Sequence, residues 1–187
     1  MTLAVHAILN DTMVPMMQSL SAILDKAIAY AEQKMGYMSA TERDLTPYKK
    51  SGGKLLLYTG WADPVVPPLD TIAYYESVTK TMGIDKTRDF LRFYLAPGMG
   101  HCGGGPGPNQ FDVLGTLEQW VEKGVAPDRI IASHSTGGKV DRTRPLCPYP
   151  LVARHKGTGS TDEAANFACV AAPPPSPPAK ATTSAMR

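Results

Sequence analysis

Asp63 and His101 are the two residues whose types and positions best suit catalysis. Each follows a short segment rich in apolar residues, 54–59 and 90–95, that predicts a β-strand. Ligands bind at the carboxyl ends of strands in open α/β sheets, so a carboxylate and an imidazole delivered there can meet in one site. An Asp–His pair is the orienting half of a serine hydrolase triad, because the carboxylate fixes the imidazole tautomer and stabilises the imidazolium.

The same two residues also fit a structural interpretation. An aspartate followed by proline, as in Asp63–Pro64, commonly forms a turn, and a histidine within a glycine-rich segment is often a surface residue. The chain order, acid before histidine, agrees with α/β-hydrolases, in which the serine comes first. The pattern alone leaves the catalytic and the structural interpretations open.

Apolar periodicity predicts the elements that would position this pair. Residues 12–35 predict an amphipathic helix with a methionine-rich apolar stripe, most simply a core-facing or partner-facing surface. Residues 68–82 predict a helix between the two strands, and the apolar face within 111–121 predicts another. This strand–helix–strand–helix order indicates an α/β fold with a parallel sheet. Beyond Ala126 we expect largely irregular structure.

These elements divide the chain into three parts. Residues 1–51 form an N-terminal amphipathic helix and linker, and residues 52–172 form the α/β portion. Residues 173–187 are proline-rich and are predicted to form a disordered tail.

Composition and charge exclude several classes of protein. The net charge of +2, without a run of like charges, gives no indication of nucleic-acid binding or of an anionic membrane surface. No apolar segment approaches the length of a transmembrane helix, and the first residues lack the basic and apolar regions of a signal peptide. We therefore expect a small-molecule partner, no nucleic acid and no membrane.

Four segments resemble, in order, motifs of the C-terminal part of the tannase and feruloyl esterase family. They are GGKLLLYTGWADP (52–64), GMGHCGGGPGP (98–108), WVEKGVAPD (120–128) and TRPLCPYP (143–150). The resemblance implies the C-terminal portion of an α/β-hydrolase fold and hydrolysis of esters of hydroxylated aromatic acids such as gallate or ferulate. It also implies that Asp63 is the triad acid and His101 the catalytic base.

The resemblance also gives roles to the three cysteines, an odd number that leaves at least one without a partner in this chain. Cys102 matches a cysteine that pairs with the residue before the nucleophilic serine, and that residue is absent here. Cys147 and Cys169 match a second family disulfide; two free buried thiols are the alternative. The family's disulfides and export imply a secreted or periplasmic parent protein.

The nucleophile and the lid of the family are missing. A nucleophile elbow requires Gly-x-Ser-x-Gly, and no serine has both glycines; Ser135 comes closest but lacks the first glycine and follows His101. The family's lid domain, often calcium-binding, is inserted upstream of the acid and is not recognisable here, so we expect no cofactor and no metal. We expect the isolated chain to be inactive, with the missing N-terminal part of the esterase as a possible partner.

Three other interpretations remain. The segment 98–103 satisfies Gly-x-Gly-x-x-Gly after a predicted strand, but glycines and prolines follow where a dinucleotide site needs a helix. A zinc site formed by His101 and the three cysteines lacks any Cys-x-x-Cys spacing. A truncated gene product without hydrolytic activity is the third possibility, and the absent serine favours it for the isolated chain.

Overall fold

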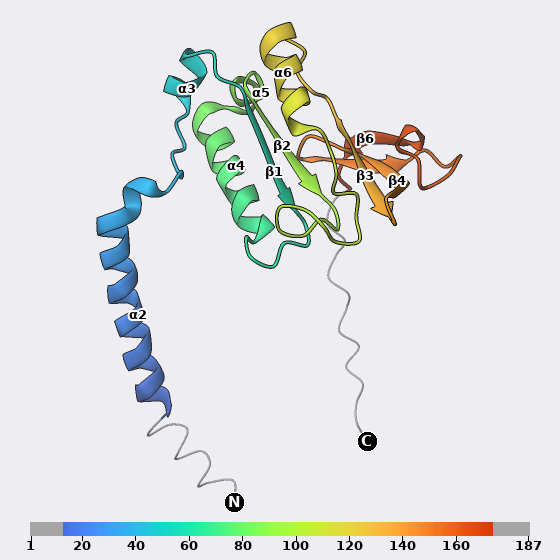
Figure 1. Ribbon diagram of the computed structural model, residues 1–187. Coiled ribbons are helices and arrows are strands. Elements are labelled where there is room, and N and C mark those ends of the chain that lie inside the picture. Colours follow the sequence, from blue (N-terminus) through green and yellow to red (C-terminus); the bar gives the residue numbers. More distant parts are fainter. Residues whose placement is uncertain (1–12, 174–187) are drawn as a thin grey trace, which may run out of the picture. The chain divides into compact units, whose positions relative to one another are not determined.

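The computed structural model describes residues 13–173, which divide between two compact units, 1–42 and 43–187 (Figure 1). The first unit contains α2 (Val14–Met35) and the 3-10 helix η2 (Gly36–Met38). The second contains the other described elements: α3 (Thr46–Lys50), β1 (Leu55–Gly60), α4 (Pro68–Met82), α5 (Ile84–Arg88), β2 (Leu91–Ala96), α6 (Val113–Lys123), β3 (Ile130–Thr136), β4 (Lys139–Leu146), β5 (Leu151–His155), η3 (Ala164–Asn166) and β6 (Phe167–Ala171). Residues 46–50, which the sequence analysis placed in the N-terminal linker, form helix α3, and this helix lies in the second unit. All but the first residue of the predicted tail lie outside the described range.

Helix α2 corresponds to the predicted amphipathic helix and contains no buried residue. Its apolar stripe is exposed, with Leu20 at 64% and Leu24 at 57% of full exposure. Helices in proteins gain most of their stability by packing an apolar face, so this stripe has the composition of a contact surface. No helix in residues 13–173 is both long and apolar enough to cross a membrane.

Strands β1 and β2 form a parallel pair in register from Leu55–Leu91 to Gly60–Ala96, and Figure 1 shows this pair between α4 and α6. Because side chains alternate along a strand, those of β1 are divided between two apolar clusters. Leu56 packs against Tyr94, Ala96, Met99, Ile130, Ala132 and Leu146, whereas Leu55 and Leu57 pack against Tyr75, Val78, Phe90, Leu91 and Phe93. The sheet therefore has an apolar cluster on each face, as expected for an α/β fold.

The helices beside this sheet begin and end with the expected signals. Helix α4 starts at Pro68, where proline suits the first turn, and is followed by Gly83 at φ 85°. Helix α6 begins after Asp112, whose Oδ1 accepts a hydrogen bond from the N–H of Gly115 at 2.8 Å. Both helices confirm the sequence prediction, although α6 begins after Phe111 rather than including it.

The expectation of irregular structure beyond Ala126 is wrong. Strands β3 and β4 form an antiparallel hairpin, and β5 and β6 form a second antiparallel pair. The β3–β4 turn is Gly137–Gly138, with φ of 58° and 78°, and two adjacent residues of positive φ match the right-handed twist of hairpin strands. The glycine pair was therefore the signal for this hairpin in the sequence.

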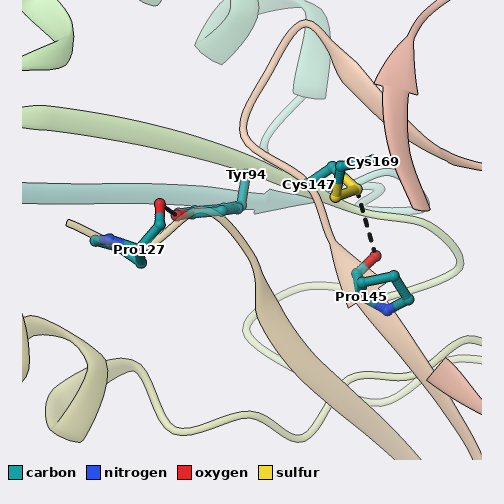
Figure 2. Close-up of a disulfide and its surroundings, with 5 residues drawn as sticks. All are labelled: Tyr94, Pro127, Pro145, Cys147 and Cys169. Atoms are coloured by element: carbon teal, nitrogen blue, oxygen red, sulfur yellow. Dashed lines mark hydrogen bonds between the residues drawn. A yellow bond between two sulfur atoms is a disulfide. The ribbon is translucent and has the colours of Figure 1, made fainter. Parts of the chain in front are cut away.

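The expected Cys147–Cys169 disulfide is present and joins the end of β4 to β6, with 5.5 Å between the Cα atoms (Figure 2). Near it, fully buried Tyr94 donates its hydroxyl hydrogen to the carbonyl of Pro127 at 2.9 Å, and burial raises the pKa of this hydroxyl. The disulfide thus joins the two C-terminal strand pairs to each other, and the hydrogen bond from Tyr94 links β2 to the segment that precedes β3.

Candidate functional site

Asp63 lies in the turn that follows β1, and the backbone of that turn holds its carboxylate. Oδ1 accepts hydrogen bonds from the N–H groups of Val65, at 2.8 Å, and Val66, at 2.9 Å. The bond from Val66 is the main cause that lowers the pKa of Asp63; burial opposes it, and Val65 and His101 lower the pKa further. The lowered pKa keeps the Asp63 carboxylate ionised at neutral pH, and the two backbone hydrogen bonds hold its side chain, which is only 6% exposed, in place.

His101 lies in the glycine-rich loop that follows β2, and its Nδ1 is 3.0 Å from Oδ2 of Asp63. An ionised carboxylate only accepts hydrogen bonds, so Nδ1 carries the proton and Nε2 of the neutral ring is the acceptor. The imidazole is 46% exposed, and no hydrogen bond to Nε2 occurs within residues 13–173. This nitrogen is therefore available to accept a proton from a hydroxyl group placed beside it.

Close backbone packing brings the two loops together. The N–H of Ala62 donates to the carbonyl of Met99 at 3.0 Å. A Cβ atom on Gly60 would lie 2.5 Å from the carbonyl oxygen of Gly100, and closer still to that of Met99, so the loop can cross the end of β1 only over a glycine. This crossing places the imidazole beside the carboxylate of Asp63.

Cys102, next to the histidine, has a free and exposed thiol. It is the only non-glycine residue with positive φ, 57°, in the described part of the chain, a conformation that costs about 1–2 kcal/mol. The four-residue zinc site considered above cannot form, because Cys147 and Cys169 are oxidised to a disulfide. Nor does the loop open a helix as a dinucleotide site requires, since the next helix, α6, begins only at Val113.

A second Asp–His pair, which the sequence analysis missed, lies on the β3–β4 hairpin. Nδ1 of His134 is 2.6 Å from Oδ1 of Asp141, and the hydroxyl of Thr136 donates to Oδ2 of the same aspartate at 2.6 Å. The hydrogen bond from Thr136, and then that from His134, lowers the pKa of Asp141. Ser135 donates to Gln110 Oε1 at 3.2 Å rather than to a histidine, and a hairpin turn follows its strand instead of a helix. Ser135 thus does not form a nucleophile elbow.

A cavity of about 470 Å³ lies near the end of β2, within the size range of ligand sites. It is lined by Trp61, Leu95, Pro97, Pro145, Cys147, Tyr149, Pro150, Leu151, Val152, Ala153 and Ala172. Neither Asp63 nor His101 lines it. The acid and the histidine therefore lie outside this cavity.

The sequence and fold match known esterases. A family model described as tannase and feruloyl esterase matches residues 8–170, a range that includes α2. The chain is 47% identical, over 147 residues, to mono(2-hydroxyethyl) terephthalate hydrolase of Piscinibacter sakaiensis, covering 77% of this chain and 24% of that protein. It is 37% identical, over 139 residues, to the tannase of Aspergillus oryzae, covering 68% and 24% of the two chains.

Solved structures give the same result. The crystal structure of feruloyl esterase B from Aspergillus oryzae superposes with a TM-score of 0.72 at 33% identity, covering 79% of this chain and 32% of that one. The chain thus spans between about a quarter and a third of these relatives, and its fold is a portion of an α/β-hydrolase. The chain belongs to the tannase and feruloyl esterase family, whose members are carboxylic ester hydrolases.

Proposed function

We propose that this chain supplies the acid and the base of a serine carboxylesterase whose nucleophilic serine lies on another segment. The observation that carries the proposal is the contact of 3.0 Å between Nδ1 of His101 and Oδ2 of Asp63, together with an Nε2 that has no partner within residues 13–173. An orienting carboxylate on one ring nitrogen and an available second nitrogen are the requirements for general-base activation of a hydroxyl.

In the proposed reaction, Nε2 of His101 removes the proton of the serine hydroxyl while the serine oxygen attacks the ester carbonyl carbon. Asp63 stabilises the imidazolium, which then protonates the departing alcohol oxygen as the carbon–oxygen bond of the ester breaks. A water molecule next attacks the acyl-enzyme, with the same imidazole as base. The carboxylic acid leaves, and the proton returns to the serine oxygen.

The proposed substrates are esters of hydroxylated aromatic acids. The relatives include a tannase, a probable feruloyl esterase and a mono(2-hydroxyethyl) terephthalate hydrolase, and the last two names contain an aromatic acyl group. The Cys147–Cys169 disulfide supports a secreted or periplasmic location of the parent protein, because disulfides persist in oxidising compartments.

Reconstitution tests this function. The partner is the part of the Piscinibacter sakaiensis hydrolase that lies outside its segment similar to this chain. The purified chain alone should not turn over a p-nitrophenyl ester of an aromatic acid and should not be labelled at serine by a fluorophosphonate. Refolded with the partner, it should hydrolyse the ester, and His101→Ala should abolish that activity.

Two results would contradict the proposal. Fluorophosphonate-sensitive turnover by the chain alone, with the label on one of its own serines, would show that the nucleophile is already present. A correctly assembled pair without turnover would instead favour the alternative of a truncated product that performs no hydrolysis.

A further inference from the structure

Two arginine side chains line a second cavity, of about 310 Å³, beside strand β4. Arg142 and Arg144 are two residues apart on this strand, so their side chains point to the same face of the hairpin. Both residues are half-buried, and neither Asp63 nor His101 lines the cavity. The cavity therefore brings together two positive charges, and the Asp63–His101 pair is not part of it.

The two guanidinium groups have few acceptors around them. Nε of Arg142 is 3.9 Å from Oδ1 of Asp162, a side chain that is 60% exposed, and Arg144 forms no ion pair within residues 13–173. Nη1 of Arg142 donates to the carbonyl of Pro106 at 3.4 Å. Nη1 of Arg144 donates to the carbonyl of the preceding residue, Thr143, at 2.7 Å. A guanidinium has five N–H donors, so both side chains can still bind a further acceptor.

The surroundings of Arg144 favour a bound anion. Burial lowers the pKa of Arg144, the positive charge of Arg142 lowers it further, and the charge of Asp162 opposes both effects. The carboxylate of Asp141 accepts hydrogen bonds from its own hairpin instead. A partly buried charge loses hydration, and two nearby positive charges repel each other. An anion in the cavity would offset both costs.

The rest of the cavity wall is mostly apolar. It includes Pro97 and Pro108, from the glycine-rich loop that carries His101, together with Leu146 and Phe167. The guanidinium carbon of Arg144 lies 4.4 Å from the centre of the Phe167 ring, and this stacking holds the guanidinium beside the apolar wall. A small inorganic anion would contact the arginines alone, whereas an anion with an apolar ring would also contact the wall.

We propose that the cavity beside Arg142 and Arg144 binds a single-ring aromatic carboxylate. The carboxylate would accept hydrogen bonds from the two guanidinium groups, whose planar donors match its geometry, and the ring would contact the apolar wall. Ligand sites usually have volumes of about 300–1,000 Å³, so a cavity of about 310 Å³ suits one ring. The acid released in the proposed reaction has this chemistry, but the inference rests on the cavity and does not require that reaction.

Titration of the 187-residue chain with 4-hydroxybenzoate, followed by nitrogen–proton correlation NMR, tests the site. The side-chain Nε–H signals of Arg142 and Arg144 and the amide signal of Leu146 should shift as the acid binds. The uncharged 4-hydroxybenzamide has the same ring and should bind at least about tenfold more weakly, as should acetate, which has no ring. Equal affinity for the benzamide overturns recognition of a carboxylate, and equal affinity for acetate overturns an aromatic ligand.

Substitution of one arginine gives an independent measurement. Arg144→Gln should weaken the binding of 4-hydroxybenzoate at least about tenfold, because charged hydrogen bonds to the carboxylate are lost. The matched control is Arg154→Gln, since Arg154 is exposed on β5 and does not line the cavity. Unchanged binding by a folded Arg144→Gln variant overturns the proposal. If this variant does not fold, the comparison with the benzamide still decides, because it uses the unmodified chain.

Three further outcomes separate this site from the catalytic pair and from the missing part of the esterase. His101→Ala should bind 4-hydroxybenzoate unchanged, and loss of binding would place the acid at the Asp63–His101 pair and overturn the proposal. Binding without ester hydrolysis in the reconstituted esterase supports the site and contradicts the proposed function, whereas hydrolysis without binding does the reverse. Binding that disappears when the Piscinibacter sakaiensis partner is added would assign the cavity to a segment of that partner and overturn the proposal as well.

Discussion

Removal of the Cys147–Cys169 disulfide should lower the free energy of unfolding of the second unit by about 3 kcal/mol. The bond closes a loop with a sequence separation of 22, and the chain-entropy relation gives about 3 kcal/mol for a loop of this length. The double variant Cys147→Ala, Cys169→Ala removes the bond without leaving new polar groups. Since whole domains are stable by only about 5–15 kcal/mol, the loss is a large fraction of the total.

Urea unfolding followed by circular dichroism measures this loss as a lower midpoint. The matched control is Cys102→Ala, which removes the exposed free thiol and should leave the midpoint nearly unchanged. Reduction of the unmodified chain should reproduce the double variant, whereas it should not affect the variant itself. A double variant within about 0.5 kcal/mol of the unmodified chain would refute the argument, since ordinary surface substitutions have effects of that size.

Two substitutions give three further predictions for the site. In the reconstituted esterase, Asp63→Asn should lower kcat by about 10⁴-fold, because an amide N–H facing Nδ1 favours the wrong imidazole tautomer. A variant with normal kcat and an unchanged pH–rate profile would contradict the role of Asp63 as the residue that orients His101. Gly60→Ala should destabilise the chain by about 1–3 kcal/mol and remove the downfield Nδ1–H proton resonance of His101, since the added Cβ would lie 2.5 Å from Gly100 O. Because the pKa of Asp63 is lower in the folded than in the unfolded chain, its contribution to stability is present above a pH of about 4 and is lost as the pH falls through the pKa of the folded state. Asp63→Asn should therefore make the free energy of unfolding depend less on pH in the acid range.

The elements around Asp63 and His101 were predictable because their signals are local. Strand β1 begins with three leucines and a tyrosine and ends at a glycine, and α4 has proline at its start and glycine after its end. The two loops that follow β1 and β2 then lie at one end of the sheet as a consequence of parallel pairing. Fold class and the approach of carboxylate to imidazole thus follow from short-range patterns together with one topological rule.

The hairpins were not predictable from apolar periodicity. In β3 only Ile130 and Ala132 are buried, so the strand has a weak apolar pattern, and its pairing depends on the glycine turn. The contact between His134 and Asp141 also depends on cross-strand register, which shifts between His134 and Ser135. Sequence spacing alone does not specify such a shift.

Because the glycine-rich loop crosses over Gly60, the geometry of the Asp63–His101 pair depends only on residues of the second unit. The carboxylate is held by amides of its own turn, and the histidine loop rests on backbone that belongs to the same unit. The acid and the base are therefore preorganised for assembly of the full enzyme. They keep their geometry when the segment that bears the nucleophile binds, and only that segment has to be positioned. Binding of the nucleophile-bearing segment would then cost little conformational entropy at the acid and the base. This favours an active complex even when the two polypeptides are made separately.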